Sequence, residues 1–593
     1  MQRRTFIGLT FSTFAGAAIS PNFSFAKALE ESSQNLSGHK TEYDIVVKSG
    51  TLGGIFAALS AAKRGLKVLL LESRTYLGTD ITASRRLWLG AEGYDELKSP
   101  LGDVFFPSAE KNSFARDLNE NRAKGDNECL LMAGSIKKGL LRSAVKAGVD
   151  VMLMADACGV LRGADNDVAG VIVALKQGLF AAKCSAFIDA SENSTFSRTI
   201  SGEKLNIEKC RYVIEIENSG VQKSRRVDAG DELNGFASSL TLHCNKRGDD
   251  RAFVEFEFYP ESNDINKIEQ QARNAACRVS KFLAKIPETK TARTNWIADN
   301  VSLKIKPSPI SISYKNYFVL KNPFKELSCA DICEIAEKAE KISAGINGGK
   351  TPSKPVAALV AGKEQKFEAD LKTNAEECGK KLPLYPVNPS IFDLPRQYSE
   401  ILIAGCGTAG NEAAKSALGK SADVAVVEYF NNPGGTKVSG GVMGYYWGIK
   451  EHEHIKKIEK EISEFSRNYK MSAITAKTLS SELKILSLGG KMFTEAIICA
   501  VETDKTNSRG NRKLTGVYAS IRGVLTKFTP KITVDATADA DVAFFAGEKF
   551  SLGDSRMGIT QNYSQWPMIL YQKNAPKKFG DMTTKDLDLL DTT

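Results

Sequence analysis

The chain has 593 residues, of which 42% are hydrophobic and 25% are charged, a balance typical of globular proteins. At roughly 100–200 residues per domain, this length predicts about three to five domains or subdomains. The composition excludes collagen-like and disordered chains, and no apolar run reaches the roughly 18 residues of a membrane-spanning helix. Lysine and arginine exceed aspartate and glutamate by 10, but this excess is dispersed, which argues against a nucleic-acid-binding face.

The first 28 residues have the features of an export signal. Arg3 and Arg4 precede an apolar stretch at 6–19, and the small residues Ala26 and Ala28 suit a signal peptidase. The arginine pair followed by Thr-Phe resembles a twin-arginine signal, a pathway that carries folded and often cofactor-loaded proteins. An ordinary secretory signal that happens to contain two arginines is the alternative. We therefore expect an exported protein, periplasmic or extracellular, without a transmembrane anchor once the signal is removed.

Eleven cysteines are scattered along the chain, and their odd number argues against a complete disulfide framework. Only Cys329 and Cys333 lie close in sequence, and no C-x-x-C pair occurs. His452 and His454 stand two apart on a charged helical segment, so their side chains point in different directions. The sequence therefore predicts no zinc, iron–sulfur or other metal site.

The chain contains a long internal repeat. Residues 43–72 and 400–428 share the order strand, glycine-bearing turn, alanine-rich helix and second strand ending in glutamate. Further along, 186–202 is echoed by 533–547. The first pair of motifs is offset by 356 residues and the second by 346, and so constant a spacing predicts a duplication.

Each copy is predicted to be an α/β domain with a Rossmann-like parallel sheet. Alternating apolar residues and turn signals predict a small antiparallel meander inserted in each domain. Helices are expected near 133–147, 264–285 and 452–468. Residues 204–310 combine strand-like runs with the second of these helices, which predicts a separate β-rich, substrate-side domain in copy one.

Copy two contains an intact G-x-G-x-x-G motif between a strand and a helix, formed by Gly405, Gly407 and Gly410. The first glycine permits the tight turn, the second admits a pyrophosphate, and the third allows close helix–strand packing. Glu428 follows Gly405 by 23 residues, where a carboxylate accepts hydrogen bonds from ribose hydroxyls. This context favours dinucleotide binding over a purely structural turn.

Copy one has lost most of this motif. Ser49 and Thr51 replace the first two glycines, while Gly54 and the strand-ending Glu72 remain. A Cβ atom at either replaced position hinders close approach of a pyrophosphate. We therefore favour a structural, cofactor-free copy one, with a cofactor-binding copy one as the alternative.

Three motifs in series carry a family resemblance: GCGTAG at 405–410, PGGTKVSGGVMGYYWG at 433–448 and VDATADADVAFFAG at 534–547. With them the chain resembles the FAD-dependent oxidoreductases of bacteria that have a glutathione-reductase-type FAD domain. It is also distantly similar to the flavoprotein subunit of heterodisulfide reductase. The resemblance covers most of 41–330 and 398–593 and implies that FAD is the cofactor.

The resemblance also assigns residues to parts of the cofactor site. Residues implied to bind the ADP half of FAD are Gly405, Gly407, Gly410 and Glu428; those implied to pass near the flavin are Gly434, Gly435 and Thr436; those in the family's D-A-T-G-D motif are Asp535, Thr537 and Asp539. Ala538 replaces the glycine of that last motif.

The combined prediction divides the chain into six parts. They are a signal peptide (1–28), a degenerate FAD-binding-like domain (41–203), a substrate-side segment with the closing piece of copy one (204–339), a linker region (340–398), the FAD-binding domain of copy two (399–550) and the start of a truncated substrate-side segment (551–593). At 316–323, NYFVLKNP stands where the family closes its FAD domain, and copy two stops before any such piece. The chain is then a fragment, or copy one supplies the missing wall, or FAD is held incompletely.

The main hypothesis is an exported FAD-dependent oxidoreductase in which the flavin accepts a hydride or electrons from an unknown small-molecule substrate. The alternative is a non-catalytic binding or structural protein on a decayed flavoprotein scaffold. An NAD-dependent dehydrogenase fits the glycine motif but not the later ones. Tyr445, Tyr446 and Trp447 are expected either to line the substrate side or to pack in the core. The sequence identifies no catalytic residue and no electron acceptor.

Overall fold

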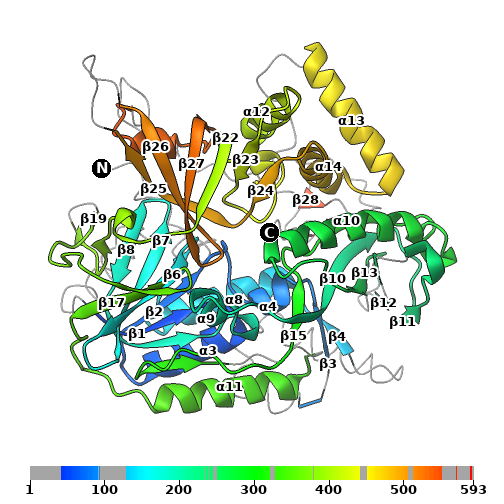
Figure 1. The fold of residues 1–593 in the computed structure, drawn as a ribbon. Helices are drawn as coiled ribbons and strands as arrows, with labels where there is room; N and C mark the ends of the chain where they lie inside the picture. The colour runs from blue at the N-terminus through cyan, green and yellow to red at the C-terminus, as the bar shows by residue number, and fades with distance from the viewer. Residues whose placement is uncertain are drawn as a thin grey trace, which may run out of the picture.

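The computed structural model describes most of the chain between residues 42 and 550 (Figure 1). The described ranges are 42–90, 92–93, 128–233, 236–237, 239–244, 250–320, 327–377, 380–440, 451–504, 512–550, 569–570 and 588–589. The predicted signal peptide, the aromatic residues at 445–447 and nearly all of 551–593 lie outside them. Within the described part, no helix is both long enough and apolar enough to cross a membrane.

A five-stranded parallel sheet forms the core of the amino-terminal half, in the order β16-β9-β1-β2-β5. The strands are β1 (Tyr43–Lys48), β2 (Val68–Glu72), β5 (Asp150–Leu153), β9 (Cys184–Asp189) and β16 (Tyr317–Val319). Every residue of β1, β2 and β9 is buried, as expected for a parallel sheet covered on both faces. Helix α3 (Leu52–Lys63) connects β1 to β2 and packs against α11 (Cys329–Ala344).

An antiparallel sheet is inserted between β5 and β9. Its central strands are β6 (Asp156–Gly163), β7 (Val168–Leu175) and β8 (Gly178–Ala182), and its edges are β17 (Pro355–Val360), β18 (Lys363–Lys366) and β21 (Tyr385–Pro386). The last three strands come from the segment predicted to be a linker (340–398). That prediction is wrong for 355–366, because β17 pairs with β6 and β18 pairs with β17 through backbone hydrogen bonds. These residues belong to the amino-terminal half.

The third sheet and one long helix form the β-rich region that follows β9. The strands are β10 (Ile207–Glu217), β11 (Arg225–Val227), β12 (Ser239–Cys244), β13 (Ala252–Phe258), β14 (Arg293–Ile297) and β15 (Ser302–Ile305). Helix α10 (Ile265–Leu283) begins at Asp264, whose side chain accepts from the Asn266 amide, a standard N-cap. Two further predicted helices are present as α8 (Ala133–Lys146) and α13 (Glu453–Tyr469).

The carboxy-terminal half is built on a sheet in the order β24-β23-β22-β27-β26-β25. Its strands are β22 (Arg396–Ala404), β23 (Val424–Val427), β24 (Lys491–Phe493), β25 (Ala496–Thr503), β26 (Leu514–Ile521) and β27 (Val524–Asp535), and its helices include α12 (Thr408–Leu418), α14 (Ala473–Ser487) and α15 (Asp541–Phe545). Strand β27 pairs antiparallel with β26 at its start and parallel with β22 toward its end. In the amino-terminal half these two pairings belong to separate strands: β8 pairs antiparallel with β7, and β9 pairs parallel with β1.

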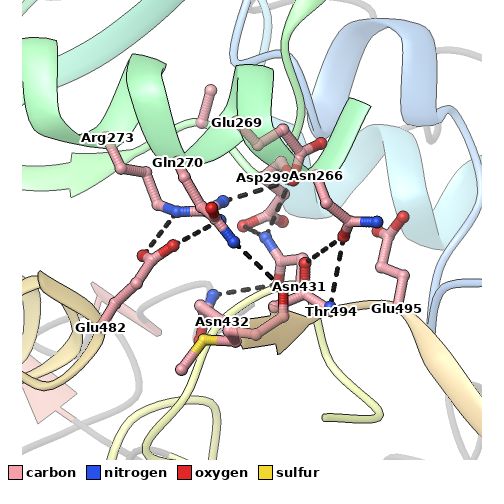
Figure 2. A network of polar contacts seen from close by, with 12 residues as sticks. Asn266, Glu269, Gln270, Arg273, Asp299, Asn431, Asn432, Glu482, Thr494 and Glu495 are labelled. Carbon is pink, nitrogen blue, oxygen red and sulfur yellow. Dashed lines mark hydrogen bonds and ion pairs between the residues drawn. The ribbon is translucent and has the colours of Figure 1, made fainter. Parts of the chain in front are cut away.

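A buried polar seam joins α10 to the carboxy-terminal half (Figure 2). The Arg273 guanidinium donates to both carboxylate oxygens of Glu482 on α14, at 2.6 and 2.8 Å. Both side chains are at most 1% exposed. Gln270 donates to the Met492 carbonyl at 3.1 Å, and the Thr494 hydroxyl lies 3.3 Å from the side-chain oxygen of Asn266. The two halves are therefore joined by hydrogen bonds, of which those between Arg273 and Glu482 are fully buried.

The meander hairpins also cross between the halves. Asp156 at the start of β6 accepts from Lys48 at 2.9 Å and, from the β26–β27 hairpin, from Ser520 at 2.7 Å and the Gly523 amide at 2.6 Å. In the opposite direction, Lys176 at the β7–β8 turn bonds Asp539. Each hairpin tip is thus anchored on the other half.

Candidate cofactor site

The glycine turn of the carboxy-terminal half has no room for side chains at its first and third glycines. Gly405 has φ +90°, and a Cβ there would lie 2.5 Å from the Ala536 carbonyl oxygen. A Cβ on Gly410 would lie 1.9 Å from the carbonyl oxygen of Gly405. Because real Cβ atoms do not approach oxygen this closely, these two glycines are needed for helix α12 to pack on β22.

Gly407 is different because space is open beside it. It is the N-cap of α12 and contributes no side-chain cap, and among the described residues a Cβ there would find only the Cα of Gly435, at 4.0 Å. Among the described residues, no side chain accepts from the amide of Thr408, the first residue of the helix. Free amides at a helix N-terminus bind anions, so this end of α12 suits a phosphate.

The second glycine pair forms a turn against the first motif. The Gly434 amide donates to the Cys406 carbonyl at 2.9 Å. Gly434 has φ +119° and Gly435 has φ +54°, and a Cβ on Gly435 would lie 2.9 Å from the Cα of Gly407. The structure therefore brings together Gly405, Gly407, Gly410, Gly434 and Gly435 around one helix end.

Two lysines lie beside this turn. Thr436 and Lys437 follow Gly435 in a short 3-10 turn (Gly435–Lys437), and Lys477 lies on α14. Burial, and next the charge on Lys437, lower the pKa of Lys477 to about 8. Burial also lowers the pKa of Lys437. A buried ammonium group whose pKa is lowered by burial and by a neighbouring cation is stabilised by an anion, and sequence reasoning missed both lysines.

Glu428 directly follows β23 and is 4% exposed. Its carboxylate accepts from the Cys406 amide at 2.5 Å and from the Phe430 amide at 2.9 Å. Burial raises the pKa of Glu428 to about 7, although these backbone hydrogen bonds lower it. A carboxylate has about four acceptor positions, and the amides of Cys406, Phe430 and Tyr429 do not use all of them, so capacity remains for a ribose hydroxyl.

The D-A-T segment builds the turn from β27 into α15. Asp535 accepts from the Thr537 hydroxyl at 2.7 Å and from the Ala543 amide at 2.9 Å. Asp539 pairs with Lys176 of the other half. Ala538, where the family has glycine, has φ +66°. In this structure Asp535 and Thr537 cap helix α15. Asp539 joins the two halves through Lys176. The Ala536 carbonyl packs against Gly405 of the glycine turn.

The glycine turn of the amino-terminal half keeps the same backbone path with other side chains. Ser49 has φ +86°, close to that of Gly405, and a Cβ on Gly54 would lie 2.0 Å from the Ser49 carbonyl oxygen. The Thr51 hydroxyl accepts from the Gly54 amide at 3.3 Å and donates to the Ala190 carbonyl at 2.8 Å. A threonine cap therefore stands where Gly407 leaves open space.

Sequence reasoning also missed the turn that follows Glu72. Gly78 lies six residues after Glu72, as Gly434 does after Glu428, and its amide donates to the Gly50 carbonyl at 2.6 Å. Two residues later, Asp80 accepts from the Leu52 amide through both carboxylate oxygens, at 3.1 and 3.2 Å. The equal spacing of glutamate and glycine in the two halves is the sequence signal that could have located Asp80.

The histidines predicted to be exposed make local contacts. The His452 ring accepts from the His454 amide at 3.2 Å, and the His454 ring lies 3.0 Å from a Glu412 carboxylate oxygen. In the part of the chain that the structure describes, no group of three or more histidine, cysteine or acidic side chains is arranged to hold a metal ion.

The family model of FAD dependent oxidoreductases matches residues 44–199 and 400–588, more than half of the chain. The chain belongs to this family, and FAD is its cofactor. The residues present fit that cofactor: α12 offers an uncapped N-terminus with open space over Gly407, two lysines stand beside it, and Glu428 retains acceptor capacity.

Curated relatives match over a limited length. The digeranylgeranylglycerophospholipid reductase of Methanocella arvoryzae is 31% identical over 130 residues, which is 21% of this chain and 32% of that protein. The enzyme of the same name from Thermoplasma acidophilum is 30% identical over 128 residues, 20% of this chain and 32% of the relative. The chain thus spans about a third of the length of these relatives.

Solved structures give similarly partial matches. A geranylgeranyl bacteriochlorophyll reductase-like protein from Thermoplasma acidophilum has a TM-score of 0.35 and 16% identity, covering 51% of this chain and 79% of its own. Glycine oxidase from Bacillus cereus has a TM-score of 0.30 and 14% identity, covering 53% and 99%.

Proposed function

We propose that the chain is an exported FAD-dependent oxidoreductase with a duplicated, glutathione-reductase-type fold, in which the carboxy-terminal half alone holds the cofactor. The observation that carries this proposal is the open N-terminus of α12 beside Gly407. When bound, FAD supplies the redox chemistry by accepting a hydride or electrons from a reduced small molecule. Export rests on the arginine pair and apolar stretch of the first 28 residues.

Duplication is supported by matching hydrogen bonds in the two halves. In each, the strand-ending glutamate accepts from the residue after the first motif position: Glu72 from Gly50 at 2.6 Å, and Glu428 from Cys406 at 2.5 Å. The glycine six residues later donates back to that same residue in both halves. Unrelated turns have no reason to share such paired contacts.

The residues of the carboxy-terminal half divide the binding of FAD between them. The first amides of α12 bind the pyrophosphate, with Gly407 leaving room for it. Glu428 accepts from the adenosine ribose hydroxyls, and the charges of Lys437 and Lys477 favour the negative phosphate end of the site. These roles require no change in the backbone of the glycine turn.

The substrate side is proposed to come in part from the amino-terminal half. Asn431, in the turn between Glu428 and Gly434, donates to the Asp299 carbonyl at 3.0 Å (Figure 2). Asp299 lies between β14 and β15 of the β-rich region, whose helix α10 also contacts Met492. This region therefore borders the carboxy-terminal cofactor turn and is placed to form a wall of the substrate site.

The test is cofactor content of the purified full chain. Wild-type protein should be yellow and release one FAD per chain on denaturation. Gly407→Val should remove the flavin because a branched side chain fills the pyrophosphate position, whereas the matched Thr51→Val should keep it. A colourless, folded wild-type protein would favour the non-catalytic alternative, and loss of flavin in the Thr51 variant alone would place FAD in the amino-terminal half.

Export is tested separately. Replacement of Arg3 and Arg4 by lysines should leave unprocessed precursor in the cytoplasm, because the twin-arginine pathway reads the arginine pair. Fractionation and immunoblotting give the result. Unchanged export would assign the segment to the general secretory pathway.

A further inference from the structure

At the N-terminus of α3 the carboxylate of Asp80 accepts a hydrogen bond from the helix. Both of its oxygens lie within 3.2 Å of the Leu52 amide, the first of the helix. Asp80 lies two residues after Gly78, and Thr436 lies two residues after Gly434. In the carboxy-terminal half the corresponding amide is that of Thr408, which no described side chain caps. An acidic side chain, whose pKa burial raises to about 7, therefore caps the first amide of α3, whereas no described side chain caps that of α12.

A second acidic residue adds to the contrast. Glu192 follows Asp189 by three residues, as Ala538 follows Asp535, so the carboxy-terminal half has no carboxylate at this position either. Burial, and next the charge on Asp80, raise the pKa of Glu192 to about 7. Arg86 and Arg74 act in the opposite direction with smaller effect.

The charged side chains near the two helix ends differ in kind, although Glu412 and Glu459 also lie near the two lysines. Asp80 and Glu192 stand near α3, whereas Lys437 and Lys477 stand near the turn of α12. A bound pyrophosphate at α3 would have to displace one carboxylate and approach the other, in a low-dielectric site where repulsion is strong.

We propose that Asp80 is an internal substitute for the dinucleotide phosphate, closing the amino-terminal half to the cofactor and so determining which half of the duplicated fold binds FAD. This inference rests on the proposed function for its carboxy-terminal counterpart. It identifies Asp80 as a specificity-determining residue and Thr51 as a second, steric obstacle. It also predicts that the amino-terminal half still has the backbone of an anion site.

The experiment restores that site while the carboxy-terminal one is disabled. Full-length Gly407→Val protein provides the background, ADP is the probe, and isothermal titration calorimetry measures binding. The triple variant with Thr51→Gly and Asp80→Thr should bind about one ADP per chain. The matched control with Gly407→Val and Thr51→Gly retains Asp80 and should bind ADP at least about tenfold more weakly, a difference of about 1.4 kcal/mol.

Two results would overturn the proposal: tight ADP binding by the control that keeps Asp80, or no binding by a triple variant with native circular dichroism. Should the threonine variant not fold, Asp80→Ser in the same background keeps a hydroxyl acceptor for the Leu52 amide, and it should also bind one ADP. Failure of the proposed function has a different signature, because wild-type protein would then contain no FAD whatever the outcome with ADP.

Discussion

The two glycine turns differ in what lies over the helix, although their backbones are held in the same way. In the amino-terminal half, Thr51 and Asp80 satisfy two amides at the start of α3. In the carboxy-terminal half, Gly407 leaves the start of α12 open. The comparison separates two roles of one motif: the third glycine and the glutamate maintain the fold, whereas the second glycine and an uncapped helix end make the site available to a ligand.

The largest expected effect is on stability, and it comes from breaking the buried contact between the two halves. Arg273→Ala should lower the free energy of unfolding by about 3–5 kcal/mol, because it leaves the buried Glu482 without its cation, whereas Glu269 keeps its ion pair with Arg522. Urea denaturation measures the loss. The control Arg225→Ala removes an exposed pair with Glu288 and should change stability much less, because solvent screens exposed ion pairs. Equal losses in the two variants would mean that the seam does not hold the halves together.

The next effect is on FAD binding, and it should differ between Glu428 and its counterpart Glu72. Glu428→Ala should weaken FAD binding about tenfold to a thousandfold, since up to two charge-assisted hydrogen bonds to the ribose are lost, each worth on the order of 1.5–3 kcal/mol. Flavin absorbance after dialysis measures the retained cofactor. The matched Glu72→Ala should leave FAD content unchanged. Full flavin content in the Glu428→Ala protein would remove Glu428 from the site and leave the glycine turn as its anchor.

A smaller effect follows from the titration of Glu428. Burial raises its pKa from 4.5 to about 7 in the cofactor-free chain, so the folded protein holds a proton that the unfolded chain releases. Stability of the cofactor-free protein should therefore fall as pH rises from 4.5 to about 7. FAD affinity should change in the opposite direction, because the charged carboxylate is the better acceptor, and should fall by at most about tenfold per pH unit below pH 7.

Fluorescence titration of FAD at pH 6 and pH 8 measures this dependence. Glu428→Gln carries no titrating group and should give nearly the same affinity at both values. A wild-type affinity independent of pH would show that the ribose contact does not use the charged form.

The smallest effect concerns backbone strain in the amino-terminal turn. Ser49 has φ +86°, a conformation that costs a side-chain-bearing residue on the order of 1–3 kcal/mol. Ser49→Gly should therefore stabilise the protein by about 1 kcal/mol after the greater chain entropy of glycine, roughly 0.5–1 kcal/mol, is subtracted. Thermal denaturation tests it, with Ser60→Gly inside α3 as a control that should destabilise. Stabilisation by both variants, or by neither, would contradict the strain argument.

Local patterns predicted much of the fold because they act within one element. Strand-like runs, the glycine turns and the helices at α8, α10 and α13 follow from periodicity and capping along a short stretch. The errors are non-local. Residues 355–366 are predicted as linker because the whole segment 340–398 is rich in lysine, proline, glycine and alanine. Their pairing with β6, far away in sequence, makes them part of a sheet.

The cofactor site likewise has local features that the sequence predicts and non-local features that it does not. The packing needs of Gly405 and Gly410 could be read from the motif, because they arise within one strand–helix turn. The positions of Asp80, Lys437 and Lys477 could not, because each depends on a second element folding back onto the turn. The closing role of Asp80 emerges only when the two copies are compared residue by residue.

The β26–β27 hairpin, which donates to Asp156, is synthesised long after the strand that it contacts. Asp156 and its donor at Gly523 are 367 residues apart. At about 5–20 residues per second, the ribosome delivers Gly523 about 20–70 s after Asp156. For that interval the newly made first half carries a buried carboxylate bonded to Lys48 but without Ser520 and Gly523, and it presents the surface of β7 on which the second meander will lie. The meander of the amino-terminal half is therefore covered only when the β25–β27 strands have been made. A nascent chain that stops before the β26–β27 hairpin exposes this sheet face to chaperones and proteases.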